Sequence, residues 1–292
     1  MEKKKAVLYV NLAVLLFGAA GLFAKGLALP AVVITFGRVF FSFAALLLYT
    51  LAARQPFKIK SRQHLGLFVL AGGLLALHWW SFLQSIKLST VAVGTITFSA
   101  FPMFVTFLEP LVFHRQLTLK NVLLALFVLA GVLVTVPEFS LGSRQVQGIA
   151  VGLVSALAYA ALTLINKALS DTYPGTTVAL YEQGVAAVLL FLCLWFADFR
   201  VTAADIGLLL ILGVFMTAFA HTLFINSLRS LPAQLAGVCS AMETVYGILF
   251  AALIFGEIPG LRECAGAAII IGVVVYAQLT VKTEPGEVEK KG

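Results

Sequence analysis

The chain has 292 residues, of which 61% are hydrophobic and only 11% are charged, and its formal net charge is +7. Soluble domains carry about a quarter charged residues, so this chain lacks the polar side chains that a water-facing surface requires. The composition therefore excludes a soluble globular protein and indicates an integral membrane protein.

Apolar runs recur along the chain, with the length of about 20 residues that a helix needs to cross roughly 30 Å of hydrocarbon. Strands of a transmembrane barrel would instead give segments of about 10 residues with alternating polarity, a pattern that the sequence lacks. In chain order the runs are 6–24, 31–51, 65–86, 91–113, 122–136, 148–169, 176–197, 206–225, 234–255 and 265–280. We therefore expect an all-α polytopic membrane protein with ten transmembrane helices.

The basic residues predict the orientation of these spans. With the amino terminus inside, fourteen of the 20 Lys and Arg residues fall on the cytoplasmic side and five on the outer side, while Arg38 lies within a span. This positive-inside bias places both termini in the cytoplasm and favours the cell membrane, as in the bacterial inner membrane. The first run has no clear A-x-A cleavage site, so we expect a retained span rather than a signal peptide. The positive charge thus orients the protein and does not indicate a nucleic-acid partner.

The two halves of the chain resemble each other at an offset of 141 residues. The stretch that begins S-A-F-P-M-F at Ser99 aligns with S-A-M-E-T-V at Ser240, and Gly131-Val aligns with Gly272-Val. With a one-residue shift, F-L-Q-S-I-K at Phe82 also resembles a stretch of the second half. The chain therefore contains an internal repeat.

Each half holds five spans, and an odd number means that the second half enters the membrane from the opposite side. Inverted repeats of this kind occur in secondary transporters, where the substrate binds between the repeats. We expect residues 1–141 to form the first five-helix repeat, 142–281 the second, and 282–292 a cytoplasmic tail.

Short motifs recur on several spans: F-G-A-A-G-L-F-A-K at 17–25, Arg38, A-V-G-T-I-T-F-S-A-F-P-M-F at 92–104, the two Gly-Val pairs, and I-F-G-E ending at Glu257. In their order and spacing they resemble the EamA-like branch of the drug/metabolite transporter superfamily, over nearly the whole chain. The resemblance implies ten helices in two inverted repeats and alternating-access transport of a small metabolite. Family members include exporters of amino acids and importers of small nutrients. The family usually has proline where this chain has Glu243, so direction and substrate are not carried over.

Glu243 lies near the middle of the ninth run, where a charge costs about 2.5–3.5 kcal/mol on insertion scales. Ser240, Glu243 and Tyr246 are spaced by threes and share a helix face, and Ser99 lies on the repeat-related face of the fourth run. Glu243 could balance a cationic substrate or carry a coupling proton. The alternative is a protonated or paired structural glutamate.

His78, Trp79 and Trp80 lie together in the outer half of the third run, where successive side chains point about 100° apart. Either tryptophan could form a cavity wall that attracts an ammonium group, or could anchor the helix at the membrane interface. His78 is a candidate proton relay or a hydrogen-bonded structural histidine. Tyr159, on the sixth run, could donate its hydroxyl to a substrate or pack in the core.

Three further polar residues are candidates for gating or ion pairing. Arg38 could gate the outer path through a carboxylate, or could snorkel toward the headgroups. Glu182 could pair with a basic residue or act as a second acid in the cavity. His221, near the cytoplasmic end of the eighth run, could pack or gate.

No motif for catalysis or nucleotide binding appears: the sequence contains no G-x-S-G, H-E-x-x-H, D-D-x-x-D or P-loop. The three cysteines lie on or beside separate spans without C-x-x-C spacing, which indicates inert thiols. We therefore expect no enzyme, no catalytic residue, no metal and no cofactor.

The leading hypothesis is a secondary carrier for a small polar metabolite, an amino acid or an amine, with proton coupling through Glu243. A channel or a non-transporting membrane interaction protein is the alternative, and the sequence leaves the oligomeric state open.

Overall fold

The computed structural model describes residues 3–55, 57–113, 117–134, 143–240, 242–256 and 258–280. Within these ranges the chain is helical and contains no strand. The helices are α1 (Lys3–Ala20), α2 (Leu22–Gly26), α3 (Ala31–Ala52), α4 (Arg62–Leu88), α5 (Val91–Phe98), α6 (Phe101–Phe113), α7 (Leu119–Val134), α8 (Arg144–Ser170), α9 (Gly175–Cys193), η1 (Leu194–Phe196), α10 (Ala203–Gly213), η2 (Val214–Phe219), α11 (Ala220–Leu228), α12 (Ala233–Ser240), α13 (Met242–Phe255) and α14 (Leu261–Thr280). Glu257 and the expected tail 282–292 lie outside the described residues.

Each of the ten apolar runs falls mainly on helix in the part that the structure describes, and seven helical stretches of this part are long and apolar enough to cross a membrane. These are Ala31–Ala52, Arg62–Leu88, Val93–Phe113, Arg144–Ser170, Gly175–Phe196, Ala203–Leu228 and Ala233–Phe255. The remaining three runs fall on α1, α7 and α14. The protein is a multi-pass helical membrane protein.

Helices begin where the sequence supplies a side chain that can satisfy the exposed backbone N–H groups of a first turn. The hydroxyls of Ser61, Thr90 and Ser143 each accept a hydrogen bond from the backbone N–H three residues on. Thr202 and Asp205 form a reciprocal capping box at the start of α10. These caps fix the ends of α4, α5, α8 and α10 at the loops.

Several spans depart from a regular α-helix within the described residues, among them the first, which is interrupted at Gly21 between α1 and α2. The fourth span is divided by a turn at Ser99 and Ala100, between α5 and α6. The eighth span contains the π-helical segment η2 between α10 and α11. A π turn places one extra residue in the helix, and such turns are frequent at functional sites.

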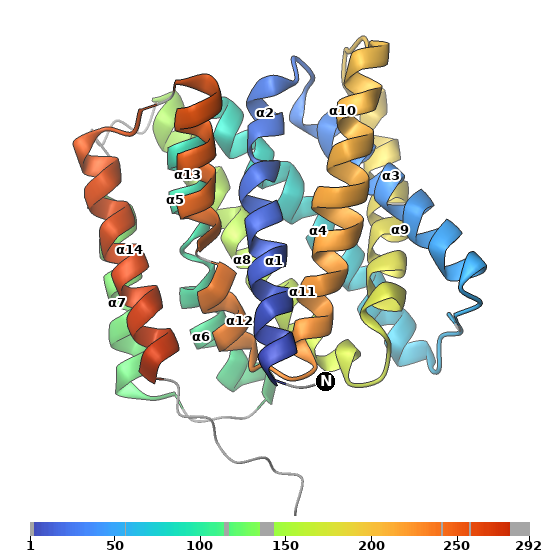
Figure 1. The fold of residues 1–292 in the computed structure, drawn as a ribbon, viewed down its shortest axis with the longest axis horizontal. Coiled ribbons are helices and arrows are strands. Elements are labelled where there is room, and N and C mark those ends of the chain that lie inside the picture. Colours follow the sequence, from blue (N-terminus) through green and yellow to red (C-terminus); the bar gives the residue numbers. More distant parts are fainter. Residues whose placement is uncertain are drawn as a thin grey trace, which may run out of the picture.

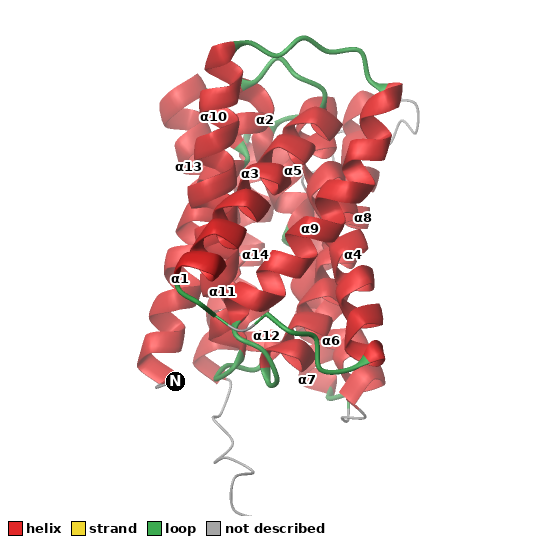
Figure 2. Cartoon of the chain, turned by 90° about the vertical axis from the view of Figure 1, so that its right-hand side faces the viewer, coloured by secondary structure: helices red, strands yellow, loops and turns green. Residues whose placement is uncertain are grey.

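The helices pack side by side, with α1 at the front of the view between the two edges, α7 beside α14 at one edge and α3 beside α9 at the other (Figure 1). The view turned by 90° shows them running along a common direction, with loops at the two ends (Figure 2). In the centre, α1 packs against α11 and α13, and α4 packs against α8 and α9. The centre of the bundle is therefore formed by helices from both halves of the chain.

Glycine allows two of these helices to approach closely. A Cβ atom at Gly18 on α1 would lie 2.5 Å from Tyr246 Cβ and 3.3 Å from the Glu243 carbonyl oxygen, both on α13. Carbon atoms in contact are normally about 3.5–4.0 Å apart, so no other residue fits here without moving α13. Gly18 therefore determines how closely Glu243 approaches the centre of the bundle.

Candidate functional site

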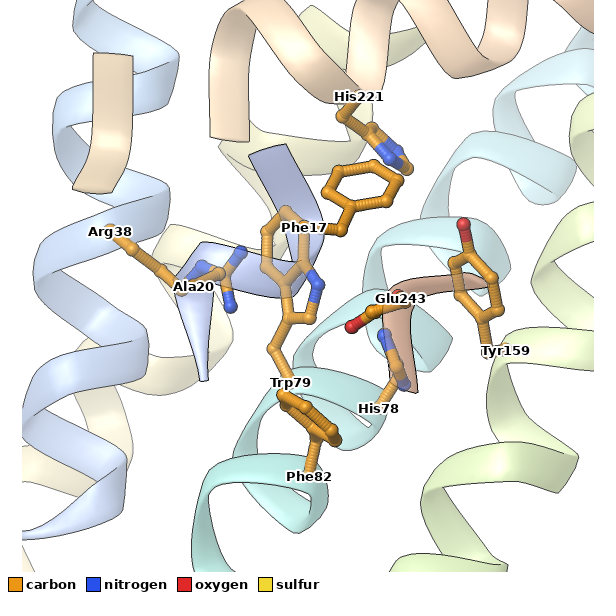
Figure 3. Close-up of a pocket in the computed structure, with 9 residues that line it drawn as sticks. All are labelled: Phe17, Ala20, Arg38, His78, Trp79, Phe82, Tyr159, His221 and Glu243. Carbon is orange, nitrogen blue, oxygen red and sulfur yellow. The ribbon is translucent and has the colours of Figure 1, made fainter. Parts of the chain in front are cut away.

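A small cavity lies at the centre of the bundle, between α1, α3, α4, α8, α11 and α13 (Figure 3). Its lining residues are Phe17, Ala20, Arg38, His78, Trp79, Phe82, Tyr159, His221 and Glu243. The cavity volume is about 10 Å³, which is room for about one water molecule. The cavity is therefore narrow, and polar side chains form much of its lining.

Arg38 enters the cavity from α3 and is held by two contacts. Its guanidinium lies over the ring of Trp79, 3.9 Å from the centroid, and its Nε donates a hydrogen bond of 3.1 Å to Thr217 Oγ1. Thr217 lies in η2, and its hydroxyl donates to the Leu212 carbonyl five residues earlier, at 2.8 Å. The π turn therefore orients the oxygen that accepts from Arg38. With 1% of its surface exposed, Arg38 is held inside the protein and does not snorkel.

Glu243 lies in the first turn of α13, is 6% exposed and lines the same cavity as Arg38. Among the residues that the structure describes, no ion pair joins the two side chains: Arg38 is engaged by Thr217 and Trp79 instead. The protein thus places one basic and one acidic side chain at a shared cavity without pairing them directly. Glu243 faces protein groups rather than lipid.

The hydrogen bonds of His78 assign its tautomer. Its Nδ1 lies 2.8 Å from Ser155 Oγ, and the Ser155 hydroxyl donates its only hydrogen to the His78 carbonyl at 3.0 Å. Ser155 Oγ must therefore accept from Nδ1–H, which leaves Nε2 of a neutral ring as an acceptor. The ring also lies against Tyr159, with centroids 4.5 Å apart. This geometry is compatible with a proton relay as well as with a structural histidine.

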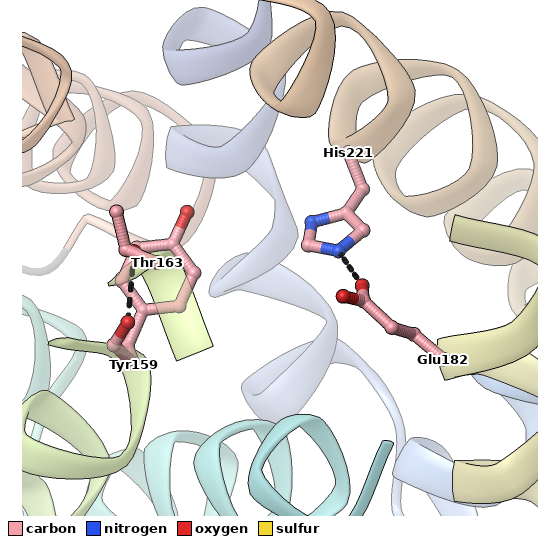
Figure 4. Close-up of polar contacts among 4 residues, drawn as sticks. All are labelled: Tyr159, Thr163, Glu182 and His221. Atoms are coloured by element: carbon pink, nitrogen blue, oxygen red, sulfur yellow. Dashed lines mark hydrogen bonds and ion pairs between the residues drawn. The ribbon is translucent and has the colours of Figure 1, made fainter. Parts of the chain in front are cut away.

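Glu182 and His221 form a buried pair between α9 and α11 (Figure 4). His221 Nε2 lies 2.7 Å from Glu182 Oε2, and both side chains are fully buried. His221 lines the cavity and Glu182 does not. Of the two alternatives for Glu182, the structure places it in a pair with a basic residue.

The other candidates occupy different positions. Tyr159 lines the cavity, and its hydroxyl has no hydrogen-bond partner among the described residues. Trp80 is 37% exposed and lies outside the lining, so Trp79 is the tryptophan that forms the wall. Ser99 and Ser240 each donate to a carbonyl of their own span at 3.0 Å.

Tyr246 also lies outside the cavity lining, although it is one turn from Glu243. Its ring stacks on Phe250 and its Cβ faces Gly18 of α1. The helix face that holds Ser240, Glu243 and Tyr246 in the sequence therefore contributes only Glu243 to the cavity.

The sequence alone did not identify several residues of the site. Phe17, Ala20 and Phe82 line the cavity but look like ordinary core residues in an apolar sequence. Ser155, which fixes His78, lies four residues before Tyr159 and therefore on the same helix face, a signal that was available. Within the described ranges no group of three His, Cys, Asp or Glu residues is arranged to hold a metal ion.

The family model described as the EamA-like transporter family matches residues 4–136 and, a second time, residues 146–277. The chain is 26% identical over 225 residues to the uncharacterized transporter YwfM of Bacillus subtilis (strain 168), covering 76% of each chain. It is 26% identical over 283 residues to the pseudopaline exporter CntI of Pseudomonas aeruginosa (strain UCBPP-PA14), covering 96% of this chain and 98% of that protein. A solved crystal structure superposes with a TM-score of 0.74 at 20% identity, over 95% of this chain and 98% of its own, which is a likeness of fold.

Proposed function

Because the chain belongs to the EamA-like transporter family, we propose that it is a secondary active transporter of a small zwitterionic metabolite, most simply an amino acid. It works by alternating access, in which the central cavity opens to one side of the membrane at a time. The relatives that match it also carry transporter names. A transport role agrees with the multi-pass fold.

The observation that carries the substrate class is the unpaired placement of Arg38 and Glu243 at one cavity. A buried charge without a partner is costly, so each group favours a ligand of opposite sign. A zwitterion satisfies both groups, with its carboxylate at Arg38 and its ammonium at Glu243. A simple amine would leave Arg38 uncompensated, and a simple carboxylate would leave Glu243 uncompensated.

Trp79 adds to this recognition. It already binds the guanidinium of Arg38 by cation–π contact, and so holds the planar group that would meet a carboxylate. Arginine donates two parallel hydrogen bonds to a carboxylate when its terminal nitrogens are available. Since Arg38 uses Nε for its hydrogen bond to Thr217, and its two terminal nitrogens have no hydrogen-bond partner among the described residues, these nitrogens are available for a ligand.

The small volume of the cavity supports a carrier over the alternative of a channel. A volume of about 10 Å³ cannot hold an amino acid, so helices must separate before substrate enters. Ion channels select by rings of like charge or of backbone carbonyls, whereas this cavity presents one charge of each sign. These features favour binding in an occluded site.

The repeat organisation belongs to the same proposal. The family model matches the chain twice, which supports residues 1–141 and 142–281 as two five-helix repeats. Inverted topology, cytoplasmic termini and an inner-membrane location follow from the span count and the positive-inside bias. Proton coupling through Glu243 stays a prediction from the sequence.

Counterflow in proteoliposomes tests the proposal. Liposomes containing the purified protein and an unlabelled mixture of the standard amino acids should take up labelled amino acids with saturable kinetics. Glu243→Gln should abolish amino acid counterflow. Arg38→Gln should also abolish amino acid counterflow, while it should keep any exchange of simple amines. Arg200→Gln, at an exposed position outside the bundle, is the matched control. Uptake that rises linearly with concentration, or full activity in both cavity variants, would contradict the proposal.

A further inference from the structure

The Glu182–His221 pair has a free hydrogen-bonding position on each side. Among the described residues, Glu182 Oε1 and His221 Nδ1 have no hydrogen-bond partner, although both atoms are buried. The side chain of Gln183, next to Glu182 on α9, is likewise buried without a partner among the described residues, and the Asn166 side chain on α8 lies close to Glu182. Buried polar groups are normally satisfied, and exceptions point to a functional role or a bound species. This cluster is therefore suited to accept a proton.

The pair lies behind the cavity wall. His221 lines the cavity and Glu182 lies on its far side, bonded to His221 Nε2. A substrate in the cavity meets His221 and cannot contact Glu182 without displacing it. A proton can pass through the imidazole, because the ring binds it at one nitrogen and donates from the other. The position thus admits protons and excludes the substrate's ammonium group.

Trp79 connects this pair to the substrate charge. The Trp79 ring makes a T-shaped contact with the His221 ring, with ring centroids 5.6 Å apart and an interplanar angle of 66°. The face of the same Trp79 ring contacts the Arg38 guanidinium at 3.9 Å. A change of charge at His221 therefore acts on the cation that would bind the substrate carboxylate.

We propose that Glu182 and His221 form the coupling-proton site of the transporter, separate from the substrate charges at Arg38 and Glu243. This inference rests on the proposed transport function. Before loading, Glu182 is a carboxylate that accepts Nε2–H from neutral His221, and the pair carries one negative charge. A hydronium ion breaks an O–H bond and leaves a water molecule, its proton forms a new bond with the lone pair of Nδ1, and the pair becomes neutral as an imidazolium and a carboxylate. No other reactant is required.

The other titratable or charged groups around the pair come from the helices packed against α9 and α11. They include Arg38 on α3, His78 on α4, Tyr159 on α8 and, across the cavity, Glu243 on α13, while Lys167 on α8 contacts α11 through a hydrogen bond of 2.6 Å to the Leu228 carbonyl. The part of α1 that packs here carries no titratable residue after Tyr9, and η2 contributes the hydroxyl of Thr217. Of these groups, Arg38 contacts the face of the Trp79 ring at 3.9 Å, and the His78 ring lies 6.3 Å from the Trp79 ring, centroid to centroid.

The sign of the coupling follows from these charges. Loading the pair with a proton removes a negative charge near Arg38, and so strengthens binding of the substrate carboxylate there. By reciprocity, substrate binding strengthens proton binding by the same factor. Proton and substrate therefore bind together, as in a symporter. Coupling at Glu243 has the opposite sign, because a proton there removes the negative charge that holds the ammonium group.

Proton uptake and counterflow together test the inference. Adding the mixture of standard amino acids to the purified wild-type protein, in weakly buffered detergent solution with a pH-sensitive dye, should cause uptake of about one proton per protein. Glu182→Gln should abolish this uptake and the accumulation driven by a pH gradient, and should keep counterflow, which needs no net proton movement. The amino acid concentration that half-saturates wild-type counterflow should fall by up to about tenfold for each unit decrease in pH, which is the limit for one linked proton. Asp198→Asn, an exposed acid in the loop after η1, should leave every readout unchanged.

Each other outcome has a defined meaning. If wild-type protein gives no counterflow, the proposed function fails; if counterflow occurs without proton uptake, the coupling-site inference alone fails. Proton uptake that persists in Glu182→Gln also overturns the inference, and proton release on substrate addition assigns coupling to Glu243. Should Glu182→Gln fail to fold, His221→Gln keeps a hydrogen bond to Glu182 while removing the proton acceptor. Absence of proton uptake by the wild-type protein overturns the inference in either case.

Discussion

Replacing Gly18 by alanine tests whether the contact between α1 and α13 positions Glu243. The added Cβ would lie 2.5 Å from Tyr246 Cβ, whereas carbon atoms in contact lie at least about 3.5 Å apart, so the helices must separate by about 1 Å. Overpacking of this size costs about 1–3 kcal/mol of stability. Displacement of a binding group by 1 Å can reduce function about 100-fold.

Gly66→Ala is the matched control, because a Cβ there meets no atom within 4 Å. Both substitutions gain helix propensity of about 1 kcal/mol, so their difference in stability isolates the steric effect. Thermal unfolding in detergent should give Gly18→Ala a lower melting temperature than Gly66→Ala, and counterflow should fall only in Gly18→Ala. Equal melting temperatures and equal counterflow would refute the view that this contact sets the depth of Glu243.

Two further predictions concern the guanidinium group of Arg38. Thr217→Val removes the acceptor of Arg38 Nε and should lower stability by about 1.5–3 kcal/mol, the range for a hydrogen bond to a charged group; chemical denaturation would measure this, and a change below about 0.5 kcal/mol would contradict it. Trp79→Leu should weaken amino acid counterflow at least severalfold, while Trp80→Leu, at an exposed position, should leave it close to wild type. Equal effects of the two leucine variants would show that the cation–π contact with Arg38 does not contribute to binding.

The helices could be predicted closely because the length of an apolar run is a local property of the sequence. The run 31–51 became α3 (Ala31–Ala52), and the run 148–169 became the core of α8 (Arg144–Ser170). Charge placement within a run was equally visible, so Arg38 and Glu243 could be chosen as candidates from the sequence. Their position at one cavity depends on the packing of α3 against α4 and of α13 against α1, which no local pattern encodes.

The rotation of each helix about its axis was the part that the sequence could not supply. Trp79 and Trp80 are equivalent in a sequence, and packing of α4 on α8 and α9 selects Trp79 for the cavity. The pairing of Glu182 with His221 joins residues 39 positions apart and depends on the contact between α9 and α11. An apolar lining residue such as Phe82 also gives no signal that separates it from the core.

The π turn at Val214–Phe219 gives the eighth span a rotational register that an unbroken α-helix would not have. One residue corresponds to about 100° of rotation, so removing the extra residue would turn α11 by that angle relative to α10. Thr217 would then leave Arg38 and His221 would leave Glu182, although neither partner had moved. The one residue inserted by the π turn thus sets the helix rotation on which both the Arg38–Thr217 and the Glu182–His221 contacts depend.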